Sequence, residues 1–165
     1  MRTLNPDHIK AVLGLINQSP YFLLLSMKVT AIWEGFATME MDIAGRHLNP
    51  FGGIHGGVYA SLIDTAVYWA VYGDIGENDG LISLDLKVDH LAQVKEGHLA
   101  VEGKRIRTEK NICIAEAAVI DSGGKYLAYG TSRQMVKHGL QTMAQVLAVT
   151  GHEPLPPKFI RNQER

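Results

Sequence analysis

The sequence predicts an α+β domain in which one antiparallel sheet wraps around a single buried helix. The stretch from Val58 to Tyr72 is apolar on nearly every face, as expected for a helix that is buried on all sides. Segments on both sides of this stretch alternate apolar and polar residues, which is the period of half-buried strands. Short turns rich in glycine and polar residues separate the later segments, so we expect antiparallel hairpins.

Before the central helix, the sequence predicts one amphipathic helix and two strands. Residues 7–17 carry apolar side chains at helical spacing, with Asp7 or Asn5 as a possible cap. Residues 21–33 predict a strand whose second half alternates, and residues 37–43 predict a second strand that pairs with it across Glu34-Gly35. Residues 44–54 contain several glycines and Pro50 and predict a loop. The central helix is expected at about residues 56–73.

Four strands are predicted after a connecting loop at residues 74–80. Residues 82–94 alternate most clearly, and residues 98–108 alternate with a slip near Gly103 that suggests a bulge. Residues 112–120 are apolar in both phases, as for a central strand covered on both faces. Asp121-Ser-Gly-Gly124 predicts a hairpin turn that leads into the last strand at residues 126–136.

These elements predict a single domain over residues 1–137, followed by a C-terminal extension over residues 138–165. The extension has one helical candidate, residues 140–149, and then Pro154, Pro156 and Pro157. We expect about the last ten residues to be poorly ordered.

Composition excludes several classes of protein. The 165 residues are 46% hydrophobic and 20% charged, as in soluble globular domains. The net charge of −1 argues against nucleic-acid binding, and the longest apolar run is too short for a membrane span. No signal peptide is evident at the start, so we expect a cytoplasmic protein. The single cysteine, Cys113, leaves no internal disulfide and no cysteine-rich metal site.

The central helix carries the residues that point to chemistry. Asp64 lies inside the apolar run, where a carboxylate is costly unless it is hydrogen-bonded, paired or used. Ser61 and Tyr68, at i−3 and i+4, share its helix face. Gly56-Gly57 can leave backbone N–H groups bare at the helix start, which suits a developing oxyanion. The alternatives are a structural Asp64 and glycines that only permit a tight turn.

Asn49 and His55 lie in the loop before this helix start. Asn49 could hold a water or a carbonyl, or it could form a turn before Pro50. His55 could hold the loop through a ring hydrogen bond. No metal-ligand spacing, Rossmann fingerprint or Walker lysine is present, so we expect no metal and no cofactor. Basic residues cluster near a hairpin end and form either a solvated face or a site for a phosphorylated ligand: Lys104, Arg105, Arg107 and Lys110.

A longer motif connects these residues. Asn49-Pro-Phe-Gly-Gly-Ile-His55-Gly-Gly57, then Asp64, then Ser83-x-Asp85-x-x-Val88, resembles the hotdog-fold acyl-CoA thioesterases. Within them it is most similar to the phenylacetate-type branch, which includes the mammalian acyl-CoA thioesterase 13 type. The resemblance covers roughly residues 20–136, and its implied fold is the α+β hotdog fold, an antiparallel sheet around a long central helix.

The resemblance implies a role for each matched residue. Asp64 would be the general base that activates a water, or else the nucleophile. Gly56 would donate its backbone N–H to the thioester carbonyl, and Asn49 would orient the water or the carbonyl. Ser83 would assist from the neighbouring subunit, and His55 would be mainly structural.

Contacts to the substrate are assigned more broadly, to Gly57, Ser61 and Tyr68, with Arg105 and Arg107 against the phosphates of coenzyme A. Coenzyme A would be part of the substrate and no separate cofactor would be needed.

The implied function is hydrolysis of an acyl- or aryl-CoA thioester by a homo-oligomer, either a dimer or a homotetramer built as a dimer of dimers. The runner-up is a non-catalytic acyl-CoA-binding module or sensor on the same fold. A hydratase or dehydratase is a third possibility, but it usually needs a catalytic histidine beside the acid, and His55 precedes the helix. The long C-terminal extension departs from the family pattern.

Overall fold

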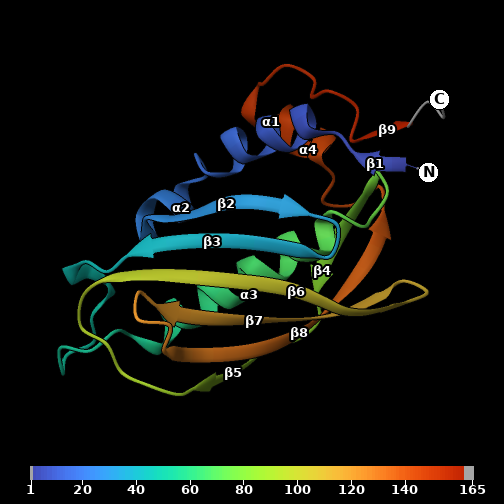
Figure 1. Cartoon of the computed structure of the whole chain (residues 1–165). Helices are drawn as coiled ribbons and strands as arrows, with labels where there is room; N and C mark the ends of the chain where they lie inside the picture. The colour runs from blue at the N-terminus through green and yellow to red at the C-terminus, as the bar shows by residue number, and fades with distance from the viewer. Residues whose placement is uncertain (1, 162–165) are drawn as a thin grey trace.

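The computed structural model describes residues 2–161. These residues form a seven-stranded antiparallel sheet whose main path runs β2-β3-β6-β7-β8-β4, with β5 also paired to β8 (Figure 1). The strands are β2 (Met27–Trp33), β3 (Phe36–Asp42), β4 (Asp79–Ser83), β5 (Lys87–His90), β6 (His98–Glu109), β7 (Ile112–Asp121) and β8 (Tyr126–His138). The predicted fold class is therefore confirmed.

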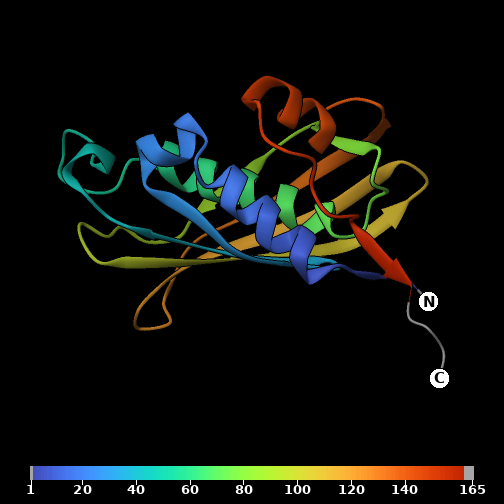
Figure 2. The ribbon, with the colours of Figure 1, turned by 90° about the horizontal axis from the view of Figure 1, so that it is seen from above.

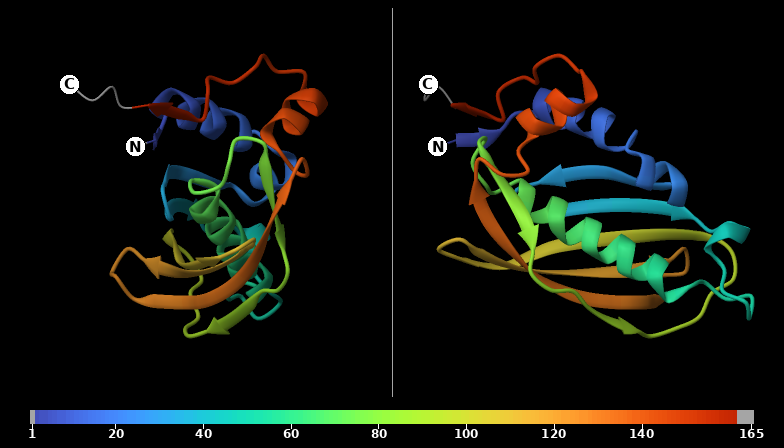
Figure 3. Two further views of the ribbon diagram at one scale, coloured as in Figure 1. Left: turned by 90° about the vertical axis from the view of Figure 1, so that its right-hand side faces the viewer. Right: turned by 180° about the vertical axis from the view of Figure 1, so that it is seen from behind.

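The long helix α3 (Gly56–Tyr72) lies inside the curved sheet, as Figure 3 shows. Its buried side chains, such as Leu62, Ile63 and Val67, pack on the inward faces of the strands. Gly103 of β6 permits this close approach, because a Cβ at this position would lie 2.3 Å from the Ala66 carbonyl oxygen. The bulge predicted near Gly103 lies slightly further along β6, between Arg105 and Arg107.

The predicted strand over residues 82–94 is wrong in its extent. The segment forms two short strands, β4 and β5, and β4 begins at Asp79, inside the predicted loop. The break between them occurs where the Asp85 carboxylate accepts hydrogen bonds from the Arg133 backbone N–H at 2.8 Å and the Arg133 Nε at 2.5 Å. Alternation in the sequence continues across this break, so periodicity alone could not locate it.

Two other predictions need correction. Residues 20–25, expected to begin a strand, form helix α2 (Pro20–Leu25), which starts with proline and ends at Ser26 in the left-handed region. Proline at the first helical position is favourable because its missing N–H is not needed there. Strand β7 is fully buried on one face only, since Ile114 is 37% exposed on the other.

Both chain ends join on one side of the molecule. Helix α1 (Pro6–Ile16) begins at the cap Asn5, and helix α4 (Met143–Thr150) follows β8; both lie outside the sheet edge formed by β2 (Figures 1 and 2). Strands β1 (Arg2–Leu4) and β9 (Phe159–Arg161) then pair antiparallel. The expectation of a poorly ordered tail is wrong up to Arg161, and residues 162–165 lie outside the described part.

Lys158 anchors this tail to the end of α3. Its side chain is 1% exposed, and its Nζ donates to the backbone oxygens of Tyr72 at 2.7 Å and Ile75 at 2.9 Å. His8 donates from Nδ1 to the Pro156 oxygen at 2.6 Å, so its Nε2 accepts from the Tyr72 hydroxyl at 2.8 Å. No helix within residues 2–161 is both long and apolar enough to cross a membrane.

Candidate active site

Hydrogen bonds to Asn49 hold the loop before α3 in its conformation. Its Oδ1 accepts hydrogen bonds from the backbone N–H groups of Phe51 at 2.9 Å and Gly53 at 3.3 Å. The backbone N–H of Asn49 donates to the Gly53 oxygen at 2.7 Å. This is the turn-forming role that the sequence left as an alternative for Asn49. The short 3₁₀ helix η1 (Gly45–His47) precedes it in the same loop.

His55 caps the start of α3. Its Nδ1 accepts a hydrogen bond from the Gly57 N–H at 2.9 Å, which satisfies one of the free donors of the first helical turn. The Gly57 N–H is therefore used in the hydrogen bond to the cap. Within the described residues no acceptor lies on the N–H of Gly56. The donor without a protein acceptor at this helix start is thus the one predicted to polarise a carbonyl.

His90 of β5 lies beside Gly56 and was missed from the sequence. A Cβ on Gly56 would lie 2.9 Å from Cε1 of the His90 ring, and the same ring packs 5.9 Å from the ring of Tyr59, centroid to centroid. Glycine at position 56 therefore lets the imidazole close over the helix start. Only the strand pairing of β5 with β8 brings His90 here, and no spacing in the sequence indicates it.

Asp64 lies two turns further along α3 and is the only charged residue of that helix. The hydroxyl of Ser83, on β4, donates to Asp64 Oδ1 at 3.2 Å. Burial raises the pKa of the Asp64 carboxyl above its ordinary value, and the hydrogen bond from Ser83 partly opposes this rise. A carboxylate with a raised pKa is better suited to take up a proton near neutral pH.

Ser83 reaches Asp64 within the same chain, and its contribution to a site on the neighbouring subunit stays a prediction. Eight residues separate Gly56 from Asp64, which places them about 12 Å apart along the helix axis at a rise of 1.5 Å per residue. One thioester carbonyl cannot contact both groups of a single chain.

Ser61 and Tyr68 share the helix face of Asp64 but have different surroundings. The Ser61 hydroxyl donates to the Gly57 oxygen at 2.9 Å and lies 2.6 Å from the hydroxyl of Tyr21 on α2. Tyr68 packs edge to face on Trp69 and lines an apolar cavity of about 400 Å³ beneath α4. Ser61 and Gly57 line a smaller cavity of about 290 Å³ at the other end of the helix.

The arginines proposed for phosphate binding are already paired. Arg105 Nε lies 2.6 Å from Asp74 Oδ2 in a half-buried ion pair, and Arg105 also covers Gly35. Arg107 pairs with Glu109 on the same strand. Both arginines therefore have a carboxylate partner in this structure, and their contact with the phosphates of coenzyme A stays a prediction.

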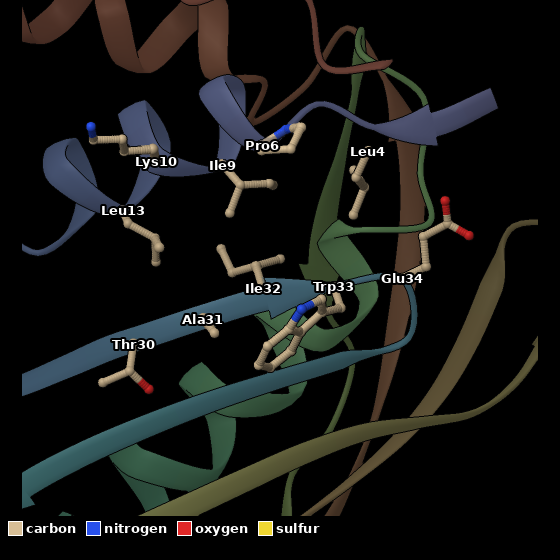
Figure 4. A pocket seen from close by; sticks show the side chains of 10 residues that line it. All are labelled: Leu4, Pro6, Ile9, Lys10, Leu13, Thr30, Ala31, Ile32, Trp33 and Glu34. Carbon is tan, nitrogen blue, oxygen red and sulfur yellow. The ribbon is translucent and has the colours of Figure 1, made fainter. Parts of the chain in front are cut away.

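Two further observations concern features away from Asp64. Within residues 2–161 no group of three or more His, Cys, Asp or Glu side chains is placed to hold a metal ion. A large apolar groove of about 500 Å³ lies between α1 and β2, lined by side chains such as Ile9, Leu13 and Ile32 (Figure 4). Strand β2 is at the opposite end of the sheet path from β4, which carries Ser83, so this groove is separate from Asp64.

Comparison with known proteins agrees with this architecture. Residues 51–128 match the family described as the thioesterase superfamily. A solved thioesterase from Haemophilus influenzae is similar with a TM-score of 0.74 and 21% identity, covering 81% of this chain and 92% of that one. A mutant thioesterase from Pseudomonas aeruginosa gives a TM-score of 0.71 and 19% identity, covering 78% and 93%. These likenesses show the fold.

The matches to curated relatives cover different shares of those relatives' lengths. A Haemophilus influenzae protein named "Putative esterase" is 28% identical over 53% of this chain, and the match spans 64% of that relative's length. A Listeria monocytogenes protein named 1,4-dihydroxy-2-naphthoyl-CoA hydrolase is 22% identical, covering 68% of this chain and 92% of the relative. The chain has the hotdog fold, and its segment from the loop before α3 into β8 is similar to the thioesterase superfamily.

Proposed function

We propose that this chain hydrolyses an acyl-CoA thioester to a carboxylic acid and free coenzyme A. The observation that carries the proposal is Asp64, a partly buried carboxylate with a raised pKa that accepts a hydrogen bond from Ser83. It lies on the helix whose first turn leaves the Gly56 N–H without an acceptor in the described residues. The match to the thioesterase superfamily and the CoA thioester in the name of the Listeria relative support the substrate class.

In the proposed mechanism, Asp64 acts as general base. It takes a proton from a water whose oxygen attacks the thioester carbonyl carbon, and the new C–O bond leaves negative charge on the carbonyl oxygen. The Gly56 N–H stabilises that oxyanion because the donor is in place before the charge develops. The tetrahedral intermediate collapses, the C–S bond breaks, and the proton on Asp64 passes to the sulfur of coenzyme A. Direct attack by Asp64 on the carbonyl is the alternative.

The proposed site is formed between two copies of the chain. Because Gly56 and Asp64 of one chain are about 12 Å apart along α3, the Gly56 that binds the carbonyl would come from one copy and Asp64 with Ser83 from the other. A homodimer has two such sites, related by its two-fold axis. Pairing of dimers into a tetramer is a further proposal that the resemblance suggests.

The acyl group is the least constrained part of the proposal. The phenylacetate-type branch suggests an aryl group, and the apolar cavity beside Tyr68 is equally suited to an aliphatic chain. A panel of aryl, short, medium and long acyl-CoAs, followed with a thiol-detecting reagent, separates these classes.

The same assay tests the activity itself. Wild-type protein is expected to release coenzyme A from at least one member of the panel, and Asp64→Asn is expected to lose about 10²- to 10⁴-fold in kcat. Asp42→Asn, which removes an exposed carboxylate on β3, is the matched control and should behave as wild type. Tight binding of an acyl-CoA without release of thiol would instead favour the binding module.

A further inference from the structure

The hydroxyl of Ser83 lies between two acceptors. Its Oγ is 3.2 Å from Asp64 Oδ1 and 3.1 Å from Gln134 Oε1 on β8. A serine hydroxyl has a single proton, so Ser83 can donate to only one of these oxygens at a time. Ser83 and Gln134 are directly opposite each other in the β4–β8 register, which holds the hydroxyl within reach of both acceptors.

The orientation of the Gln134 amide is determined by the groups behind it. Gln134 is 0% exposed, and its Nε2 donates to Ser132 Oγ at 2.7 Å. The hydroxyl of Ser132 donates to the backbone oxygen of Asp85 at 2.7 Å. A carbonyl oxygen can only accept, so the Ser132 proton is used there and Ser132 Oγ must accept from Gln134. The Gln134 oxygen is thereby directed at Ser83.

Asp85 supports this chain of hydrogen bonds from the strand break. Its carboxylate accepts two hydrogen bonds from Arg133, between Ser132 and Gln134 in the sequence. The motif Ser83-x-Asp85 thus acquires a physical meaning that the proposed mechanism does not use: Asp85 fixes the end of β4 against β8.

We propose that Gln134 is a positioning residue that serves as the second acceptor for Ser83, so that Ser83 can turn away when Asp64 takes up a proton. The inference rests on the proposed function of Asp64. While Asp64 is ionised, Ser83 donates to it. When Asp64 has taken the proton from water, the Ser83 hydroxyl rotates to Gln134 Oε1, and its own oxygen can accept from the Asp64 O–H. No proton leaves Ser83, and the rotation reverses when Asp64 protonates the sulfur of coenzyme A.

Gln134 matters because a buried hydroxyl without an acceptor is unfavourable. Without it, Ser83 would have Asp64 as its only acceptor among the described groups and would oppose the protonation that catalysis requires. Charged groups on the neighbouring helices do not provide an alternative explanation for a change in the protonation of Asp64. Helices α2 and α4 carry no charged residue and α3 carries only Asp64. The titratable Tyr68 is one turn away on α3.

Most charged groups near Ser83 on the adjacent strands are paired with each other, and Lys137 of β8 lies opposite Gly80, three residues before Ser83 on β4. On β4, Asp79 pairs with His138 of β8, and just beyond its end Asp85 pairs with Arg133. On β5, Lys87 pairs with Asp89. The interaction of Asp64 with Ser83 is therefore the one that Gln134 can change.

The test is the pH dependence of kcat/KM in Gln134→Met, which keeps the side-chain volume and removes the acceptor. With Asp64 as the remaining acceptor for Ser83, the acid limb is expected to move to lower pH by about 0.5–1 unit, the size of the neutral hydrogen bond from Ser83 to Gln134 that is lost. Ser83→Ala should move it to higher pH, and adding Gln134→Met to Ser83→Ala should produce no further shift. Ser132→Ala, which frees the Gln134 amide to rotate, should shift the limb in the direction of Gln134→Met but less.

Cys113→Ala is the matched control, because Cys113 is buried directly opposite Gln134 on β7 and its hydrogen-bond partner is Thr108, away from Ser83 and Asp64 in the network. It should lower stability and leave the pH profile unchanged. If Gln134→Met and Cys113→Ala give the same profile, or if Gln134→Met shifts the limb equally without Ser83, then Gln134 only packs and the inference is wrong. If Gln134→Met folds poorly, the pH profile of Ser132→Ala tests whether Gln134 acts as the second acceptor for Ser83.

A second readout does not depend on activity. Titration of the Asp64 carboxyl carbon by NMR, in protein carrying ¹³C-labelled aspartate, should give a lower pKa in Gln134→Met than in wild type. Absence of hydrolysis across the acyl-CoA panel would overturn the proposed function alone. An unchanged Asp64 titration in Gln134→Met would overturn the role of Gln134, whatever the panel shows.

Discussion

Gly56 and Asp64 are eight residues apart on α3, and this spacing separates the Gly56 amide from the carboxylate by about 12 Å along the helix axis. Each has its own support: His55 caps the neighbouring Gly57 amide, and Ser83 donates to Asp64. The two halves of the proposed chemistry are therefore complete within one chain but too far apart to act on one carbonyl. Substitutions that remove one half at a time are informative for this reason.

Gly56→Pro is expected to remove the oxyanion donor while keeping the helix. Proline is favoured at the first helical position, and the extended backbone of His55, with φ −70° and ψ 135°, suits a residue before proline. We expect a loss in kcat of about 10²- to 10³-fold. Gly56→Ala retains the N–H and meets the same His90 ring, so it is the matched control. A similar loss in both variants would assign the effect to His90 displacement.

Mixing the two defective chains tests the shared site. If each site takes Gly56 from one copy and Asp64 from the other, a heterodimer of Gly56→Pro and Asp64→Asn chains contains one intact site. Random exchange in an equal mixture should then restore about a quarter of the wild-type activity, since half of the dimers are mixed and each has one working site of two. Activity that stays at the level of the separate variants after exchange would place both groups in one chain's site.

Two substitutions of Asn49 distinguish a role in folding the loop from a role in binding the substrate. Asn49→Ala removes the acceptor for the Phe51 and Gly53 amides and should lower the free energy of unfolding by about 1–3 kcal/mol. Asn49→Asp keeps the acceptor oxygen and should retain both stability and kcat within a few-fold. Denaturant unfolding and thiol release measure the two effects. A stable Asn49→Asp protein that has lost most of its kcat would show that the amide nitrogen contacts the substrate.

Gly103 has a steric role that a single substitution can measure. In Gly103→Ala the new Cβ would overlap the Ala66 carbonyl at 2.3 Å, so α3 and β6 must move apart. We expect a loss of about 1–3 kcal/mol in the free energy of unfolding. Gly14 in α1 is the matched control, because a Cβ added there would have no atom within 4 Å, and Gly14→Ala should stabilise the protein by about 0.5–1 kcal/mol. If Gly103→Ala and Gly14→Ala change the free energy of unfolding in urea equally, then α3 and β6 are not in close contact at Gly103.

Much of this architecture could be predicted from local pattern, because periodicity reports which face of an element is buried. The long apolar run predicted α3, and Asp121-Ser-Gly-Gly124 predicted the turn between β7 and β8. The strand break at residues 84–86 could not be predicted, because its cause is a contact between Asp85 and Arg133, 48 residues away in the sequence. The same holds for the short helix α2, where the apolar run fits strand and helix equally.

The residues of the candidate site come from the sequence, and their arrangement comes from the structure. Asp64 stood out because a carboxylate is unusual in an apolar helix, and the motif spacing indicated Gly56, His55 and Ser83. Spacing could not show which copy supplies Ser83, or that Asn49 uses its oxygen inside its own loop. One signal for Gln134 was present: Ser132 and Gln134 occupy the buried phase of the last strand, where polar side chains need partners.

Lys158 makes a prediction about stability and pH. Burial, with a smaller effect of the Arg2 charge, lowers the pKa of Lys158 in the folded chain to about 7 from an ordinary value of 10.5. Between these two values the unfolded chain binds one more proton than the folded chain, so the free energy of unfolding should rise with pH by at most about 1.4 kcal/mol per unit. Below about pH 7 this contribution is constant, because both states are protonated.

Lys158→Met isolates this effect, because methionine fills the buried space and cannot titrate. Urea unfolding at several pH values between about 6.5 and 9 should show the wild-type stability rising relative to the variant as pH increases. The variant also loses two hydrogen bonds to the carbonyl oxygens of Tyr72 and Ile75 at the end of α3, which should lower its stability at every pH. A constant difference between the two proteins across this range would mean that Lys158 keeps its proton in the folded chain and that the carbonyl oxygens and the Tyr72 ring, 3.6 Å from its Nζ, stabilise the ammonium.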